Sequence, residues 1–173
     1  MELTTQNPSP SLTDATVGSF MTKDVRTGDV NTPLRDCVRL MMEQNIGSVV
    51  VLEKETPVGI FTERDLVRLV GGGKENLDAK MSEVMSSSLA TIAPTATLWD
   101  AISLMGHMNI RRLPVVDKGK LVGILTEKDV MRLLLSQQNL LLEAVAEYLP
   151  AMTREQLQTL VLHFAPEKPS PIT

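Results

Sequence analysis

A seven-residue pattern that combines a threonine with an aspartate occurs twice in the sequence. It reads GIFTERD at residues 59–65 and GILTEKD at residues 123–129, and each copy precedes an apolar segment with helical spacing. The start of a helix exposes unpaired N–H groups and the positive end of the helix dipole, so it favours an anion such as a phosphate. Asp65 and Asp129 would lie in the first turn, where their oxygens can accept hydrogen bonds from both hydroxyls of a ribose.

The same spacing also predicts a helix cap. In that interpretation Thr62 or Thr126 accepts a hydrogen bond from a backbone N–H group, and the aspartate three residues later reaches back to the threonine. Capping and ribose binding are compatible, because a carboxylate has two oxygens. The ligand-binding hypothesis fails if both aspartates fold back onto main-chain amides and side chains also fill the neighbouring clefts.

These two patterns belong to a longer duplication. Like residues recur at a constant offset of 64, among them Met21 with Met85 and Asp36 with Asp100. The copies span residues 17–70 and 81–134. Because two repeats are too few for a solenoid, we expect the copies to pack on each other and bury a shared face.

Each copy has the same predicted order of elements, an α/β (α+β) arrangement of small sheets flanked by helices. A short helix ends near Met21 and Met85, and an amphipathic helix begins at Leu34 and Leu98. Two strands and the helix that follows the threonine then close each copy. The predicted strands are residues 25–27, 48–52 and 58–61 in the first copy and 89–92, 112–116 and 121–125 in the second.

The other segments are predicted to be linkers or extensions. Residues 71–80 join the copies, and their three glycines lack the Gly-Lys-Ser/Thr ending of a phosphate-binding loop. Residues 1–16 are predicted to be a disordered lead-in, and residues 166–173 a frayed tail. Beyond the end of the second repeat at residue 135, residues 136–165 carry apolar helical stripes that would either cover the tandem or contact a second chain or partner.

Composition argues against several classes of function. Hydrophobic residues make up 43% and charged residues 22% of the 173 residues, which is ordinary for a soluble globular protein, and no apolar run could span a membrane. A net charge of −4 with 3% aromatic residues argues against nucleic-acid binding. The lone Cys37 is expected to be a core residue in a cytoplasmic protein. His107 and His163 are isolated, so neither a metal site nor a catalytic triad is predicted, and we expect no enzyme.

The duplicated pattern, with RLPVVD at residues 112–117 and a leading Met-Thr or Met-Ser, resembles the CBS-domain pair, or Bateman module. The resemblance covers residues 17–135. It implies two CBS repeats in a pseudo-two-fold tandem, with two clefts that bind adenine nucleotides such as AMP, ADP or ATP, or relatives such as NAD or S-adenosylmethionine. It also implies a regulatory module that senses ligands without performing chemistry, pairs into a flat homodimeric disc and acts on an effector protein.

Carried over position by position, the resemblance assigns residues to ligand binding. It implies that Asp65 and Asp129 bind the ribose, with Thr62 and Thr126 as their hydroxyl partners. The residues implied to form the base pocket are Met21, Val25, Arg26, Met85, Leu89 and Ala90. Those implied to face the phosphate or line the cleft are Arg64, Ile110, Arg111, Arg112, Pro114 and Lys128.

The two copies differ where the phosphate is expected. The second copy reads IRRLP at residues 110–114, whereas the first reads IGSVV at residues 46–50 and lacks both arginines and the proline. We therefore expect unequal clefts, with the phosphate charge met mainly by residues of the second copy, because arginine offers a charged fork. The sequence leaves open which cleft the arginines serve.

The alternative is an interaction scaffold without nucleotide binding. In that hypothesis the apolar stripe after the second copy docks a partner or a second chain. Its candidate contacts are Leu141, Val145, Leu157 and Val161.

Overall fold

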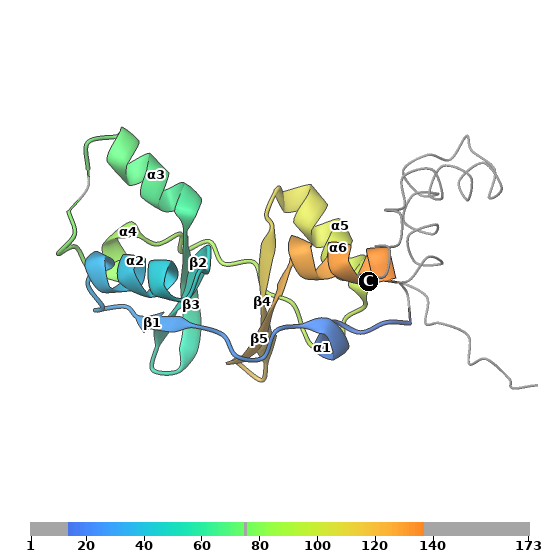
Figure 1. The fold of residues 1–173 in the computed structure, drawn as a ribbon. Helices are drawn as coiled ribbons and strands as arrows, with labels where there is room; N and C mark the ends of the chain where they lie inside the picture. Colours follow the sequence, from blue (N-terminus) through green and yellow to red (C-terminus); the bar gives the residue numbers. More distant parts are fainter. Residues whose placement is uncertain (1–13, 75, 137–173) are drawn as a thin grey trace, which may run out of the picture.

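The computed structural model describes residues 14–74 and 76–136 (Figure 1). The predicted tail, the predicted C-terminal helices apart from residue 136, and most of the predicted lead-in lie outside the described residues. The helices are α1 (Val17–Phe20), α2 (Leu34–Glu43), α3 (Glu63–Gly71), α4 (Met81–Val84), α5 (Leu98–Met108) and α6 (Glu127–Ser136). The strands are β1 (Thr27–Asp29), β2 (Ser48–Glu53), β3 (Thr56–Thr62), β4 (Arg112–Asp117) and β5 (Lys120–Thr126).

Each copy contains one antiparallel hairpin, β2 with β3 and β4 with β5. A bulge interrupts both hairpins at equivalent positions, after Val51 and after Val115. Alternate residues of the hairpins point into the core, so Phe61 and Leu125 are fully buried at equivalent places. The mixture of helices and small sheets predicted from the sequence is confirmed.

The predicted brief strands differ from the observed ones. The first lies two residues later, as β1, and pairs in parallel with β2, whereas the second is a single parallel bridge between Ile92 and Val115. Val25 and Leu89 cannot join a ladder, because their N–H groups donate to the carbonyls two residues earlier. The second strand also stops early, because Pro94 has no N–H group where Val30 donates to the Leu52 carbonyl.

The leading segment of each copy, defined as residues 14–26 in the first copy and 78–90 in the second, crosses to the other copy. Thr22 of the first copy pairs with Ile124 on β5, and Ser86 of the second copy pairs with Ile60 on β3. The two pairs are related by the offset of 64. As Figure 1 shows, α1 therefore lies beside the second hairpin.

The crossing produces two cores that do not follow the repeat boundaries. Val17 of α1 is fully buried among second-copy residues such as Leu113 and Leu125, and Met81 of α4 is fully buried among first-copy residues. Ala15 is 4% exposed in the same core as Val17. Residues 14–16, which the sequence analysis placed in the lead-in, are thus part of the fold.

A methionine of each leading segment rests on a glycine of the other copy. The sulfur of Met85 lies over Gly59, and that of Met21 lies over Gly123. A Cβ atom on either glycine would also come within 3.0 or 3.1 Å of a backbone carbonyl, that of Ser86 or Thr22. The first residue of the duplicated pattern is therefore glycine because the other copy approaches closely.

Candidate functional site

Both predicted helix caps are present. Asp65 Oδ2 accepts hydrogen bonds from the Thr62 N–H at 2.9 Å and the Thr62 hydroxyl at 2.6 Å. Asp129 Oδ2 accepts the equivalent bonds from Thr126 at 3.0 and 2.6 Å. The capping interpretation of the duplicated pattern is confirmed.

Each aspartate keeps its second oxygen outside the cap. In the described part of the chain, Asp129 Oδ1 is contacted by the Arg132 guanidinium at 3.6 Å. Asp65 Oδ1 lies 3.7 Å from Arg68 and accepts a long hydrogen bond of 3.4 Å from the Ser86 hydroxyl. The Asp129 oxygen is therefore the less occupied of the two.

A cleft opens beside each cap. The Asp129 cleft has a volume of about 380 Å³ and takes in Thr126, Lys128 and Asp129. The Asp65 cleft has a volume of about 230 Å³ and takes in Thr62, Arg64 and Asp65. Both aspartates fold back onto main-chain amides, but the clefts beside them are open, so the condition that would have ended the ligand-binding hypothesis is met only in part.

Each cleft joins a helix start of one copy to the leading segment of the other. The Asp129 cleft is walled by residues 22 and 24–26 of the first copy, and the Asp65 cleft by Ser86 and Ser88 of the second. This arrangement follows directly from the crossing of the leading segments. It makes the two clefts pseudo-symmetric counterparts.

Arg111 and Arg112 line both clefts. In the Asp65 cleft they hold the places that Gly47 and Ser48 hold in the Asp129 cleft. The Arg112 guanidinium lies 3.8 Å from the Glu63 carboxylate, and its side chain is 22% exposed. Burial lowers the pKa of Arg112 from its usual value, and the positive charges of Arg111 and Arg64 act in the same direction, whereas Glu63 opposes them. Arginine stays charged at neutral pH despite this shift.

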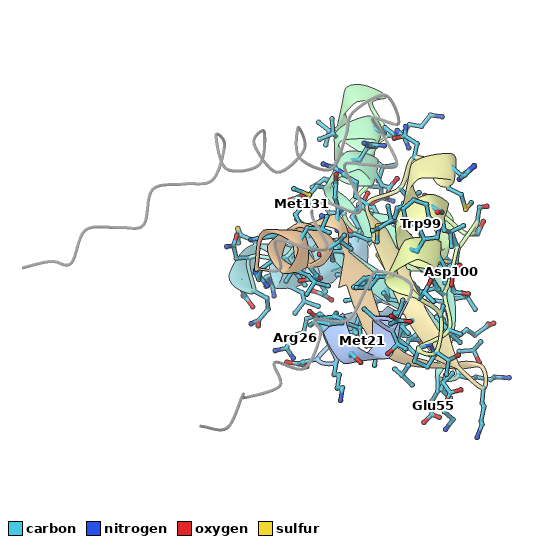
Figure 2. The ribbon with its side chains drawn as sticks, turned by 90° about the vertical axis from the view of Figure 1, so that its right-hand side faces the viewer. Met21, Arg26, Glu55, Trp99, Asp100 and Met131 are labelled. Atoms are coloured by element: carbon cyan, nitrogen blue, oxygen red, sulfur yellow. The ribbon has the colours of Figure 1, made fainter. Side chains whose placement is uncertain are left out.

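The structure brings most of the predicted site residues together. Val25, Arg26, Thr126, Lys128 and Asp129 line the Asp129 cleft. Thr62, Arg64, Asp65 and Ile110 line the Asp65 cleft. Arg26 and Met21 of the leading segment are both labelled in Figure 2.

Five predicted residues do not line either cleft: Met21, Met85, Leu89, Ala90 and Pro114. The two methionines are turned onto the glycines of the opposite copy. Pro114 is a buried residue of β4. Leu89 makes the same tight turn as Val25, but only Val25 lines a cleft.

Sequence reasoning missed several lining residues. Thr22 and Ser86 line equivalent walls, as do Asp24 and Ser88, and Arg68 adds a cation to the Asp65 cleft. Thr22 and Ser86 carried a usable signal, because both are hydroxyl residues at the constant offset and directly follow the leading methionine.

The helix starts offer fewer unpaired amides than expected. The Glu127 N–H donates to the Arg111 carbonyl at 2.9 Å, and the Glu63 N–H donates to the Gly47 carbonyl at 3.2 Å. The Asp129 N–H is taken by the Thr126 hydroxyl at 3.3 Å. Positive charge for a phosphate must therefore come mainly from side chains rather than from free backbone groups.

Residues 14–74 and 76–136 lack two further features. This part of the chain has no group of three or more His, Cys, Asp or Glu side chains arranged to hold a metal ion. It also has no helix that combines the length and the apolar character needed to cross a membrane.

The tandem of α+β repeats, the crossed leading segments and the paired clefts define a two-repeat module. Comparison with known sequences gives its family, because the CBS domain matches the chain twice, at residues 17–72 and 81–136. The chain belongs to the CBS-domain family.

Known relatives are similar over the same region. The uncharacterized protein MK0525 of Methanopyrus kandleri is 40% identical over 67% of this chain and 61% of its own length. The CBS domain-containing protein YhcV of Bacillus subtilis is 36% identical over 67% of this chain and 83% of its own length. This chain thus spans less than two thirds of MK0525.

A solved structure is also similar. The crystal structure of CBSX2 in complex with AMP is 31% identical in sequence and superimposes with a TM-score of 0.64, over 70% of this chain and 97% of CBSX2. The AMP in that structure is bound by CBSX2.

Proposed function

We propose that this protein is a regulatory module that binds an adenine nucleotide, with the Asp129 cleft as its principal site. The observation that carries the proposal is the Asp129 carboxylate, which caps its helix with one oxygen and keeps the other beside an open cleft. That second oxygen can accept a hydrogen bond from a ribose hydroxyl. A similar structure in the family holds AMP.

The size of the clefts supports the choice of site. Small-molecule pockets in proteins have volumes of roughly 300–1,000 Å³. The Asp129 cleft, at about 380 Å³, lies within this range, whereas the Asp65 cleft, at about 230 Å³, lies below it. The Asp65 oxygen is also already contacted by Ser86.

Charged side chains in the Asp129 cleft suit a phosphate. Arg111, Arg112 and Lys128 line it together with Arg26. An arginine fork binds a phosphate with two parallel charge-assisted hydrogen bonds, which a lysine cannot do. The module can regulate only if the nucleotide binds two of its conformations with different affinity. In this proposal the two conformations differ in how the two copies pack on each other.

The test compares two aspartates that cap helices in the same way. Asp129→Ala removes a cap and the proposed ribose contact, and we expect AMP affinity to fall about tenfold, or about 1.4 kcal/mol. Asp100→Ala removes an equivalent cap, in which Asp100 accepts from Thr97 at 2.9 and 2.7 Å, outside both clefts (Figure 2). Its AMP affinity should stay within about twofold of wild type, although both variants lose about 0.5–2 kcal/mol of stability.

Isothermal titration calorimetry of the full chain measures both affinities. Equal AMP affinity in the Asp129→Ala and Asp100→Ala variants would remove Asp129 from the site. The same titration with S-adenosylmethionine and NAD decides between the adenosyl ligands, since only the nucleotides carry a phosphate for the arginines.

A second candidate function is a protein contact. Met42 on α2 and Val67 and Val70 on α3 are 76%, 70% and 56% exposed, which favours an interface with a second copy or an effector protein at one of these helices. Native mass spectrometry of the purified protein tests it, because a monomer at micromolar concentration would argue against a homodimer.

A further inference from the structure

We infer that the two clefts share one pair of arginines, so that an anionic nucleotide bound in one cleft weakens the binding of a second in the other. The inference rests on the proposed function and adds a rule for how the two clefts fill. Its basis is that Arg111 and Arg112 line both cavities, although each cavity also has residues of its own.

A glycine of the first copy lets Arg112 lie between the clefts. A Cβ atom on Gly47 would collide with the Arg112 guanidinium, and it would come within 2.7 Å of Glu63 Oε2. The equivalent residue in the second copy is Arg111. The first copy therefore has no arginine of its own at this place and leaves room for an arginine of the second copy to occupy it.

The clefts differ in the charge they have without the shared pair. The Asp129 cleft has Arg26 and Lys128 against Asp24, Glu127 and Asp129, and Arg26 is already paired with Asp24 at 3.2 Å. The Asp65 cleft has Arg64 and Arg68 against Asp65 alone. Without Arg111 and Arg112, the side chains that line the Asp129 cleft have a net negative charge, and those that line the Asp65 cleft have a net positive charge. The Asp129 cleft thus depends more strongly on Arg111 and Arg112.

One guanidinium fork cannot bind two phosphates in opposite clefts at once. When a nucleotide in the Asp65 cleft takes Arg112 in a bidentate contact, the Asp129 cleft loses that charge. Two phosphates on either side of a shared wall also repel each other. Both effects weaken the binding of the second nucleotide. By linkage, a nucleotide in either cleft weakens binding in the other by the same factor.

The comparison of AMP with adenosine isolates this effect. Adenosine can make the ribose contacts at Asp65 and Asp129 but carries no phosphate for the arginines. We therefore expect two adenosine molecules to bind independently, whereas the second AMP binds about tenfold more weakly than it would to an empty protein.

The experiment measures each cleft alone and both together by calorimetry. Asp65→Ala and Asp129→Ala are each expected to weaken one cleft about tenfold, so each variant reports mainly the affinity of the other cleft for AMP and for adenosine. In wild type, the second AMP should bind about tenfold more weakly than the single-cleft values predict. If the two wild-type constants for AMP equal the two single-cleft constants, the inference is wrong while the proposed function stands. If the wild type and both variants fail to bind AMP, both proposals are wrong.

Two variants test whether the arginine carries the coupling. Arg112→Gln removes the shared charge, and the AMP coupling factor should fall to within about twofold of the adenosine value. Ser48→Arg places an arginine at the position equivalent to Arg112 and should also reduce the coupling, because the Asp129 cleft then has a fork of its own. Lys120→Ala is the control, since Lys120 pairs with Glu55 outside both clefts and its loss should leave the AMP constants unchanged. An unchanged coupling factor in Arg112→Gln would overturn the inference.

Discussion

The last helix of the second copy, α6, has a buried apolar face, whereas the apolar face of the last helix of the first copy, α3, is only partly buried. In α6, Val130, Leu133 and Leu134 are 5–8% exposed, whereas no residue of α3, within the described ranges, is buried. Figure 1 shows α6 alongside α5, while α3 points away from α2. The duplication has thus kept the close contacts at Gly59 and Gly123 and both caps, but it has not kept the burial of the helices that follow them.

The largest expected difference between α6 and α3 is in how much the protein loses stability when an equivalent leucine on each helix is truncated. Leu133 and Leu69 are equivalent leucines on α6 and α3, and only Leu133 is buried. Leu133→Ala should lower the free energy of unfolding by about 2–4 kcal/mol, and Leu69→Ala by about half of that or less, because less apolar surface and a smaller cavity are involved. Urea unfolding of both variants measures the difference. Equal losses would contradict the comparison and show that α3 is covered in solution.

Titration of the Cys37 thiol gives the next largest expected change in stability, and this change appears only at alkaline pH. Cys37 is buried on α2, where the second copy has Ala101, and burial, with a smaller contribution from Asp36, raises the pKa of the thiol to about 11. The unfolded chain releases this proton near its ordinary pKa of about 8.5, so stability falls as pH rises from about 9 to 11. We expect this loss to be roughly 1–3 kcal/mol.

Cys37→Ala copies the second-copy residue and should remove that alkaline loss. Denaturant unfolding of wild type and variant at pH 7, 9 and 10.5 measures it, and subtraction cancels the other groups that titrate in this range. A difference between the two proteins that does not change with pH would show that the thiol titrates alike in the folded and unfolded chains.

A substitution in the β2–β3 hairpin turn gives the smallest expected change in stability. Glu55 has φ 70° in the first turn, where the second has Gly119 with φ 81°. A positive φ strains any residue with a Cβ atom, so Glu55→Gly should stabilise the protein by about 0.5 kcal/mol. The exposed ion pair of Glu55 with Lys120, at 3.1 Å, offsets part of this gain.

Glu55→Gln is the control for the turn, because it removes the charge and keeps the strain. Thermal unfolding should rank Glu55→Gly above wild type and Glu55→Gln at or slightly below it. The reverse order would mean that the ion pair outweighs the backbone conformation.

Local patterns in the sequence predicted most of the fold. The amphipathic helices α2 and α5, both hairpins and the helix starts at Thr62 and Thr126 follow from periodicity and capping chemistry over a few residues. The constant offset of 64 predicted that both copies would have the same elements. These features depend on neighbours in the chain, so a single sequence contains the necessary information.

Contacts between distant segments could not be predicted in the same way. Nothing local in the two leading segments indicates that each crosses to the other copy. The family resemblance implied that Met21 and Met85 form the base pocket, whereas in the structure their sulfurs lie over Gly123 and Gly59. The shared position of Arg111 and Arg112 depends on the same crossing. The shortened second strand had a readable cause in Pro94, which removes one ladder hydrogen bond.

The burial of Val17 and Met81 in the opposite cores limits how small a stable piece of this protein can be. A fragment cut at the linker between the repeats keeps its own leading helix but loses the one that fills its interior. Two identical fragments can repair each other by trading those helices, as in domain swapping. A single repeat with this architecture would accordingly need a second copy to complete its core, and the linker supplies that copy within one chain.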